Sequence, residues 1–395
     1  MKTKIYLDSR WVFPISFLLI IIIDLLTNTI NTTQNQWDFA YYIALAKDGF
    51  NAEPLASPFA YRFFTPGLVH LLSLTGLSIE NGFLVIAYFG AIAQLMGIFY
   101  FVQWLTKSNR GAWIALFVTA FSMFNIKFLV FDPFRPDHLA YALILLQTYF
   151  AFERRFLPLL ILTIIGSTIR EFTLVPLAAY LFMVAQDSKM RTLAAKQDLI
   201  AAILVLPAVF LPRYLIPVTE NFQLIGLSTE GLLNAIALFF IPSFPVNFIF
   251  SIIAYFLPLF LLANLTDVRT AFQQLPNSRR SYLIGYSVLV LILSFFGGTD
   301  YNRFATFLFL PQIILIGLLD QVSNTKLALT FFCLFIFNRL WMHIPDWDVQ
   351  TYRDFFGGFA LQLNLQTAYR YAELFLFIAI GVFMNRKRQD EIPTV

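Results

Sequence analysis

The residues best suited to chemistry are charged side chains at the ends of long apolar runs. Asp38 opens the segment WDFAYYIALAKDGF, and Arg62 follows in SPFAYRFFTP. Charges at membrane depth are costly, and they usually serve a function or pair with one another. We expect the whole set to converge on one outward-facing cavity, and the alternative is a series of local ion pairs that stabilise helix ends. The later members of the set border other apolar runs: Asp132, Arg135, Asp137, Arg170, Glu171, Asp300 and Arg303.

Asp38 is the candidate general base. A base must come within hydrogen-bonding distance of the acceptor hydroxyl, and a loop that lies on a membrane surface can place it there. The other interpretation of Asp38 is an N-cap, because it begins a predicted amphipathic helix. Asp48, directly before Gly49, is either a second carboxylate of this cavity or a turn residue at the helix end.

Three arginines are candidates for binding a phosphate, because the planar guanidinium is always charged and matches phosphate oxygens. Arg62 has snorkelling to lipid headgroups as its alternative role. Arg170 stands beside Glu171 in IGSTIREFTLVPL, and neighbours on a helix point in different directions, so each should meet a partner on another span. Arg303 closes the turn GGTDYNR, which also holds Asp300.

The carboxylates could instead bind a metal ion. The three histidines, at positions 70, 138 and 343, show no HExxH-type spacing. A Mg²⁺ or Mn²⁺ ion held by Asp38, Asp137 or Glu171 is the alternative use of these side chains. Asp137 has a further interpretation as the N-cap of the span that follows it. The sequence has no Walker loop and no GxSxG, so it does not support NTP-driven transport or serine hydrolysis.

Composition defines the elements that must position these residues. Of the 395 residues, 59% are hydrophobic and 13% are charged. Such a chain is a polytopic helical membrane protein, because lipid accepts only helices or closed barrels. We predict an all-α transmembrane bundle of about 10–12 spans in a single membrane domain, 1–395, with no separate soluble domain. The apolar runs are 11–30, 83–105, 111–130, 138–152, 156–169, 172–186, 198–213, 246–264, 281–296, 304–320, 327–342 and 371–384.

Several of these runs are shorter than the roughly 20 residues that a crossing needs. The pair at 156–186 is therefore either a hairpin or a broken helix. The first run follows Lys2, Lys4 and Arg10 and resembles an uncleaved signal-anchor.

Basic residues predict the orientation. They gather in loops that alternate along the chain, which places both termini in the cytoplasm. The net charge of +4 comes mainly from these flanks and does not indicate nucleic acid. The outer side then carries the loops 31–82, 214–245 and 343–370. The short loops favour a bacterial inner membrane.

The first outer loop, 31–82, is predicted to hold two helices in the plane of the membrane surface. Tyr41, Tyr42, Leu45 and Ala46 share one face of the first helix. The second covers Phe63–Leu74.

These features together resemble bacterial members of the C-type glycosyltransferase superfamily. The resemblance covers the first two thirds of the chain and the Asp300–Arg303 turn, and it rests on the early Asp38, the SPFAYRFFTP segment, the Arg170–Glu171 pair and that turn. It implies a polyprenyl-phosphate-linked sugar as donor and a catalytic acid in the first outer loop, which Asp38 matches by position. Many members carry a paired-acid motif in that loop, whereas Trp37-Asp38-Phe39 offers one carboxylate, and no large C-terminal soluble domain is visible in this sequence.

The sequence therefore predicts an enzyme that moves a sugar from a polyprenyl-phosphate donor to a glycan, lipid or protein acceptor on the periplasmic or lumenal side. In an inverting displacement Asp38 would be the base, and Arg62, Arg170 or Arg303 would steady the phosphate. Asp48, Asp137, Glu171 and Asp300 would support the cavity. The alternatives are a lipid-linked polysaccharide polymerase or ligase, a flippase, or a non-catalytic scaffold in which these charges do not converge.

Overall fold

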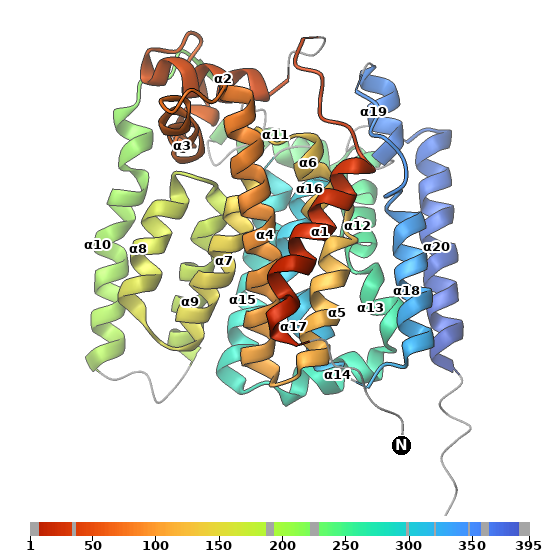
Figure 1. Ribbon diagram of the computed structural model, residues 1–395. Helices are drawn as coiled ribbons and strands as arrows, with labels where there is room; N and C mark the ends of the chain where they lie inside the picture. The colour runs from red at the N-terminus through yellow and green to blue at the C-terminus, as the bar shows by residue number, and fades with distance from the viewer. Residues whose placement is uncertain are drawn as a thin grey trace, which may run out of the picture.

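The computed structural model describes residues 8–33, 37–186, 193–221, 229–297, 300–319, 321–346, 348–356 and 363–386. Predictions that fall on Lys2, Lys4, Gly298 or Thr299 lie outside the described residues. The described chain is all-α apart from one pair of two-residue strands. Most helices stand side by side in one bundle, and the start of α1 and the end of α20 lie at the same end of it (Figure 1). We call this end of the bundle the lower end and the opposite one the upper end.

The upright helices match the predicted apolar runs. They are α1 (Val12–Leu25), α4 (Ile79–Thr106), α5 (Asn109–Ala120), α6 (Phe128–Phe131), α7 (Asp137–Phe152), α8 (Phe156–Ser167), α9 (Val175–Gln186), α10 (Leu193–Leu215), α12 (Ser243–Tyr255), α13 (Leu257–Leu262), α15 (Asn277–Phe296), α16 (Tyr301–Ala305), α17 (Phe309–Leu318), α18 (Asn324–Phe337) and α20 (Leu365–Arg386).

Shorter elements close the two ends. The upper end carries α2 (Phe39–Asp48), α3 (Phe64–Ser73) and α19 (Val349–Phe356), and α14 (Leu265–Gln274) lies across the lower end (Figure 1). One further short helix is α11 (Thr229–Phe239). The two strands are β1 (Ala56–Ser57) and β2 (Glu220–Asn221). These strands pair in parallel, so they join the first long loop to the chain that follows α10.

Four helical segments of the described chain are long and apolar enough to cross a membrane. They are Ile79–Thr106, Asn277–Phe296, Tyr301–Leu318 and Leu365–Arg386. A fifth span results if Asn109–Ala120 and Met123–Phe131 are taken together, although they meet at 69°. The remaining predicted runs form shorter apolar helices, such as Phe156–Ser167 and Asn324–Phe337. Length and composition thus support four or five spans of the 10–12 predicted.

The bend between α5 and α6 has a local cause. Residues Met123–Lys127 form a π-helical turn, which interrupts the regular ladder of backbone hydrogen bonds. The fully buried Lys127 donates from this turn to the carbonyl groups of Arg339 at 2.8 Å and Leu340 at 3.2 Å. The bend therefore places a cation at the end of α18.

The segment at 156–186 is a helical hairpin, the first of the two predicted forms. The chain leaves α8 through Arg170, which is extended (φ −159°, ψ 141°), and re-enters helix at the 3₁₀ turn Glu171–Leu174. Gly166 permits this turn, since a Cβ at that position would lie 2.6 Å from the Thr173 side chain. Figure 1 shows α8 and α9 beside each other. Arg170 and Glu171 thus stand at the turn of a hairpin instead of within one continuous span.

An aromatic cluster holds α2 in place at the upper end. Phe39 packs on Phe134 with ring centroids 5.5 Å apart, and Tyr42 meets the edge of Phe59 at 5.4 Å. The helix buries Phe39, Tyr42, Leu45 and Ala46, whereas Tyr41 is only half-buried. The predicted apolar face is therefore shifted by the inclusion of Phe39.

Candidate functional site: a network of arginines and carboxylates

Asp137 is the most deeply buried carboxylate of the site. It is the first residue of α7, and its side chain is fully buried. Its Oδ1 lies 3.0 Å from Nε of Arg170, and its Oδ2 lies 3.5 Å from Nε of Arg303. Pro136 occupies the N-cap position, so the interpretation of Asp137 as an N-cap is wrong. One carboxylate thus joins the α8–α9 turn to α16.

Asp38 forms an ion pair with Arg135, in the turn that precedes α7. Its Oδ2 lies 3.2 Å from Nη1 of Arg135, which also pairs with Asp132. Asp38 occupies the N-cap position of α2, but its side chain caps no backbone N–H. The Asp38 side chain is 43% exposed, whereas Arg135 is 9% exposed. Asp38 is therefore positioned by a buried arginine while its own carboxylate stays accessible.

Arg62 enters the site from the loop before α3. It donates from Nη2 to Glu171 at 3.0 Å and from Nη1 to the hydroxyl of Tyr42 at 3.0 Å. Glu171 also accepts from Arg213 at 3.1 Å. Arg213 was missed by the sequence analysis, although a basic residue at the very end of an apolar run was the signal that could have found it. Its guanidinium also stacks on the ring of Tyr61 at 5.7 Å.

Asp300 completes the arrangement. Its Oδ2 lies 3.4 Å from Nη1 of Arg303. Burial raises the pKa of Asp300 to about 6, against the opposing effect of Arg135. The carboxylates of Asp137 and Asp38 raise this pKa further. Asp300 therefore lies within electrostatic reach of both the Asp38 pair and the Asp137 pairs.

The ion pairs, together with the electrostatic effect of Asp38, Arg135 and Asp137 on Asp300, define one group of charges, which we call the upper network. Arg135–Asp132 and Arg303–Asp300 are local pairs, but the other ion pairs link loops, helix starts and a hairpin turn that are far apart in the sequence. The nine charges singled out in the sequence all belong to it, together with Arg213. Its members are Asp38, Arg62, Asp132, Arg135, Asp137, Arg170, Glu171, Arg213, Asp300 and Arg303.

Several buried donors of the network make no aligned hydrogen bond. Nε of Arg170 and both Nε and Nη1 of Arg303 are within ion-pair distance of carboxylates but have no hydrogen-bond partner. An unsatisfied buried donor costs roughly 1–3 kcal/mol. Arginine N–H groups form strong, charge-assisted hydrogen bonds to phosphate oxygens. The network thus offers unused donors of the kind that bind an oxyanion.

Two predicted features do not join this group. Asp48 is exposed in the last turn of α2, where Gly49 follows with a φ of +60°, and it makes no ion pair within the described chain. Among all the residues that the structure describes, no three His, Cys, Asp or Glu side chains are placed to hold a metal ion. Asp38, Asp137 and Glu171 instead face arginines.

An apolar groove begins beside the upper network. It has a volume of about 670 Å³ and is lined by side chains of α4, α7 and α8. Phe64, Leu139 and Ile169 line it and are sequence neighbours of Arg62, Asp137 and Arg170. The remaining lining includes Gly97, Tyr100, Trp104, Leu143, Tyr149 and Ile165. The groove thus leads away from the arginines along the long axis of the bundle.

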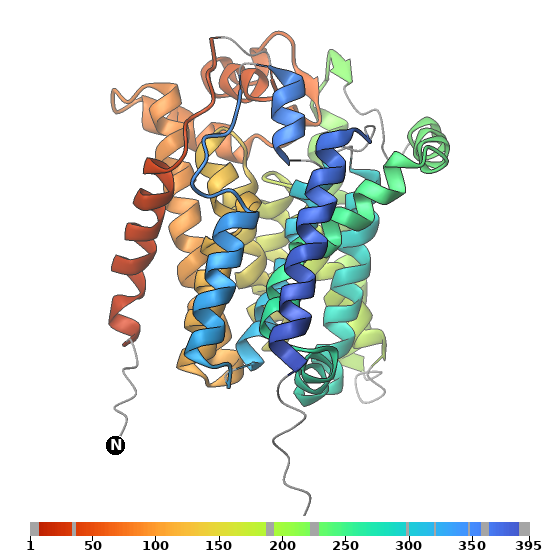
Figure 2. The same cartoon turned by 90° about the vertical axis from the view of Figure 1, so that its right-hand side faces the viewer.

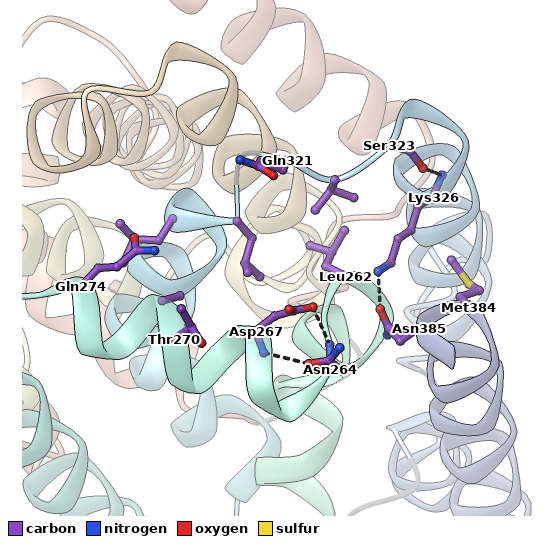
Figure 3. A pocket seen from close by; sticks show the side chains of 14 residues that line it. Leu262, Asn264, Asp267, Thr270, Gln274, Gln321, Ser323, Lys326, Met384 and Asn385 are labelled. Carbon is purple, nitrogen blue, oxygen red and sulfur yellow. Dashed lines mark hydrogen bonds between the residues drawn. The ribbon is translucent and has the colours of Figure 1, made fainter. Parts of the chain in front are cut away.

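A second hollow of about 630 Å³ lies at the lower end, between α14 and the ends of α18 and α20 (Figure 3). Asn264 and Asp267 cap α14 there, and Lys326 bonds to Asn385. None of the candidate residues named above lines this hollow. The chemistry expected from the sequence therefore belongs to the upper end.

No protein-family model, curated protein or solved structure matches this chain.

Proposed function

We propose that this chain is an integral membrane glycosyltransferase with the C-type architecture, and that the upper network is its active site. The observation that supports the proposal best is that the arginines of the upper network and an apolar groove are built from the same segments of the chain. The segments that carry Arg62 and Arg170 also supply Phe64 and Ile169 to the lining of an apolar groove. A polyprenyl-phosphate sugar has this same division, with an anionic head and a long apolar tail.

In this proposal the described bundle crosses the membrane about 10–12 times, with some spans built from short or broken helices. The lower end faces the cytoplasm with both termini, and α2 and α3 lie at the outer surface. The most fitting location is a bacterial inner membrane. The long axis of the groove then follows the direction of the lipid tails.

Arg62, Arg170 and Arg303 would bind the donor phosphate. Arg170 and Arg303 have buried N–H groups without hydrogen-bond partners. Arg62 is positioned by Glu171 and Tyr42. Fixed cations of this kind stabilise the charge that develops on a leaving phosphate. Asp137, Glu171 and Asp300 would hold the arginines in position, while Asp48 has no contact that assigns it a role.

Asp38 would act as the general base, because it is the carboxylate of the network that is most open to an acceptor. Its carboxylate takes the proton of the acceptor hydroxyl, and the oxygen attacks the anomeric carbon of the sugar. The bond from that carbon to the phosphate oxygen breaks, and the polyprenyl phosphate leaves as an anion. The product is a glycoside with inverted configuration.

A panel of donors tests this proposal. The purified protein in lipid nanodiscs receives radiolabelled polyprenyl-phosphate sugars or nucleotide sugars, together with an extract of envelope glycans and lipids as acceptors. We expect labelled product from a polyprenyl-phosphate sugar and none from the nucleotide sugars. Transfer from nucleotide sugars alone would overturn the proposal. Movement of the labelled lipid between leaflets without transfer would instead support a flippase.

A further inference from the structure

A second cluster of cations, of which Lys127 and Arg370 are buried, surrounds the upper end of α18. Lys127 bonds to backbone carbonyl groups and pairs with no carboxylate within the described chain. Arg339 and Arg370 share one carboxylate, Glu373, which lies 3.8 Å from Nη2 of Arg339. Three cations therefore face one anion. The backbone carbonyls at the end of a helix offset part of this excess, since they carry partial negative charge.

Arg370 is the member of this cluster with an unused donor. Its side chain is 7% exposed and stacks on Phe337 with its guanidinium carbon 4.5 Å from the ring centroid. Nη1 donates to the Phe337 carbonyl at 3.1 Å and to Glu373. Nε has no hydrogen-bond partner although it is fully buried. An unsatisfied donor on a buried charged group is costly.

Arg370 lines a cavity of about 40 Å³ between α12, α17, α18 and α20. Figure 2 shows α12, α18 and α20 beside one another on the face turned to the viewer. Polar groups of Ser122, Ser251, Tyr255, Asn302 and Asn338 line it with Arg370, and no carboxylate does. A water needs roughly 10–15 Å³ of such space, so the cavity has room for a few water-sized particles.

We propose that this cavity binds a single small anion of halide size, held by the guanidinium of Arg370. The anion would offset the excess of positive charge around α18 and lie against Arg370 and the polar side chains that line the cavity. Its site is distinct from the upper network, because no member of the network lines the cavity. The site therefore does not depend on the glycosyltransferase proposal, and it would fix α20 against α18 whichever reaction the protein performs.

Cys333 provides the reporter for a test. It is the single cysteine of the chain and is buried, so a thiol-reactive dye labels it only as the protein unfolds. The purified full-length protein is melted in chloride, bromide or gluconate at constant ionic strength. We expect the melting temperature to rise with chloride or bromide and to saturate, because a ligand that binds only the folded state stabilises it by mass action. Gluconate is too large for the cavity and should have no effect.

Arg370→Gln should abolish the halide response. Arg279→Gln is the matched control, because Arg279 also stacks on aromatic rings, Trp104 and Phe152, but does not line the cavity. If Arg370→Gln does not fold, a crystal of the wild type in bromide gives the answer through anomalous scattering. A bromide peak beside Arg370 would support the site. Only water there, or a melting temperature that is equal in all three salts, would overturn it.

Discussion

At the scale of single residues, the upper network explains why charges stand in an otherwise apolar chain. Each arginine pairs with a carboxylate, and most pairs join separate elements. That these charges converge could be predicted, because a charge at the end of an apolar run must find a partner. Which partner it finds could not. Asp137 meets Arg170 and Arg303, and only the three-dimensional arrangement of α7, the hairpin turn and α16 brings them together.

The first prediction concerns Asp137. Asp137→Asn leaves the buried Arg170 without its carboxylate and Arg303 with Asp300 alone, and breaking a buried ion pair costs about 3–5 kcal/mol. We expect a loss of this size in the free energy of unfolding in detergent. Asp48→Asn is the control, because exposed substitutions usually stay within about 0.5 kcal/mol. Equal stability of both variants would show that the pairs to Asp137 contribute nothing.

The second prediction concerns the pKa of Asp300. Its folded value of about 6 lies above the ordinary value of 3.8, so the folded chain binds this proton more tightly. The stability that this provides is complete below about pH 4 and is lost as the pH rises through about 6, with a total of at most about 3 kcal/mol. Asp300→Asn should remove this part of the pH dependence.

The measurement is the difference in melting temperature between wild type and Asp300→Asn across this pH range. Comparing the two proteins cancels the titration of the carboxylates that do not interact with Asp300. A difference that does not change between pH 4 and 7 would contradict the raised pKa.

At the scale of elements, the apolar runs located the helices well. The predicted run 138–152 is α7 within one residue, and 281–296 lies inside α15. Breaks within the runs could not be predicted from periodicity. The run 246–264 divides into α12 and α13, and 111–130 bends at a π-helical turn. Pro258 lies in the first turn of α13, and at the π-helical turn Lys127 contacts the chain after α18.

Close helix crossings supply the third prediction. A Cβ added to Gly111 in α5 would lie 2.1 Å from the carbonyl oxygen of Gly317 in α17. Gly111→Ala should therefore force the two backbones apart and destabilise the fold by about 1–3 kcal/mol. Gly67→Ala in α3 has no atom within 4 Å of the new Cβ, and it should be neutral or stabilising by up to about 1 kcal/mol. Thermal melts of the two variants compare them, and an unchanged melt for Gly111→Ala would contradict the crossing.

At the scale of the whole molecule, the bundle has two different ends. The upper end carries the network, α2 and α3, and the lower end carries α14 and both ends of the described chain. The sequence could predict this polarity, because basic residues gather in alternate loops. It could not predict the number of full crossings, since several apolar helices are shorter than a membrane is thick.

Orientation in the membrane gives the fourth prediction. Lys47 on α2 and Thr266 on α14 are exposed at opposite ends, and the native Cys333 is buried. In intact bacterial cells a thiol reagent that cannot cross the inner membrane should label Lys47→Cys directly. Thr266→Cys should react only after that membrane is permeabilised. The reverse labelling pattern would place the network on the cytoplasmic side.

The central claim is that Asp38 is the base of a sugar transfer carried out in the upper network. The measurement that tests it most directly is a single-turnover transfer of radiolabelled sugar from its polyprenyl-phosphate donor by wild type, Asp38→Asn and Asp48→Asn. We predict that Asp38→Asn loses at least about a hundredfold in rate, as expected for a missing general base, with its melting temperature retained. Asp48→Asn, a carboxylate of the same helix outside the network, should transfer at the wild-type rate. Equal rates for wild type and Asp38→Asn would contradict the account.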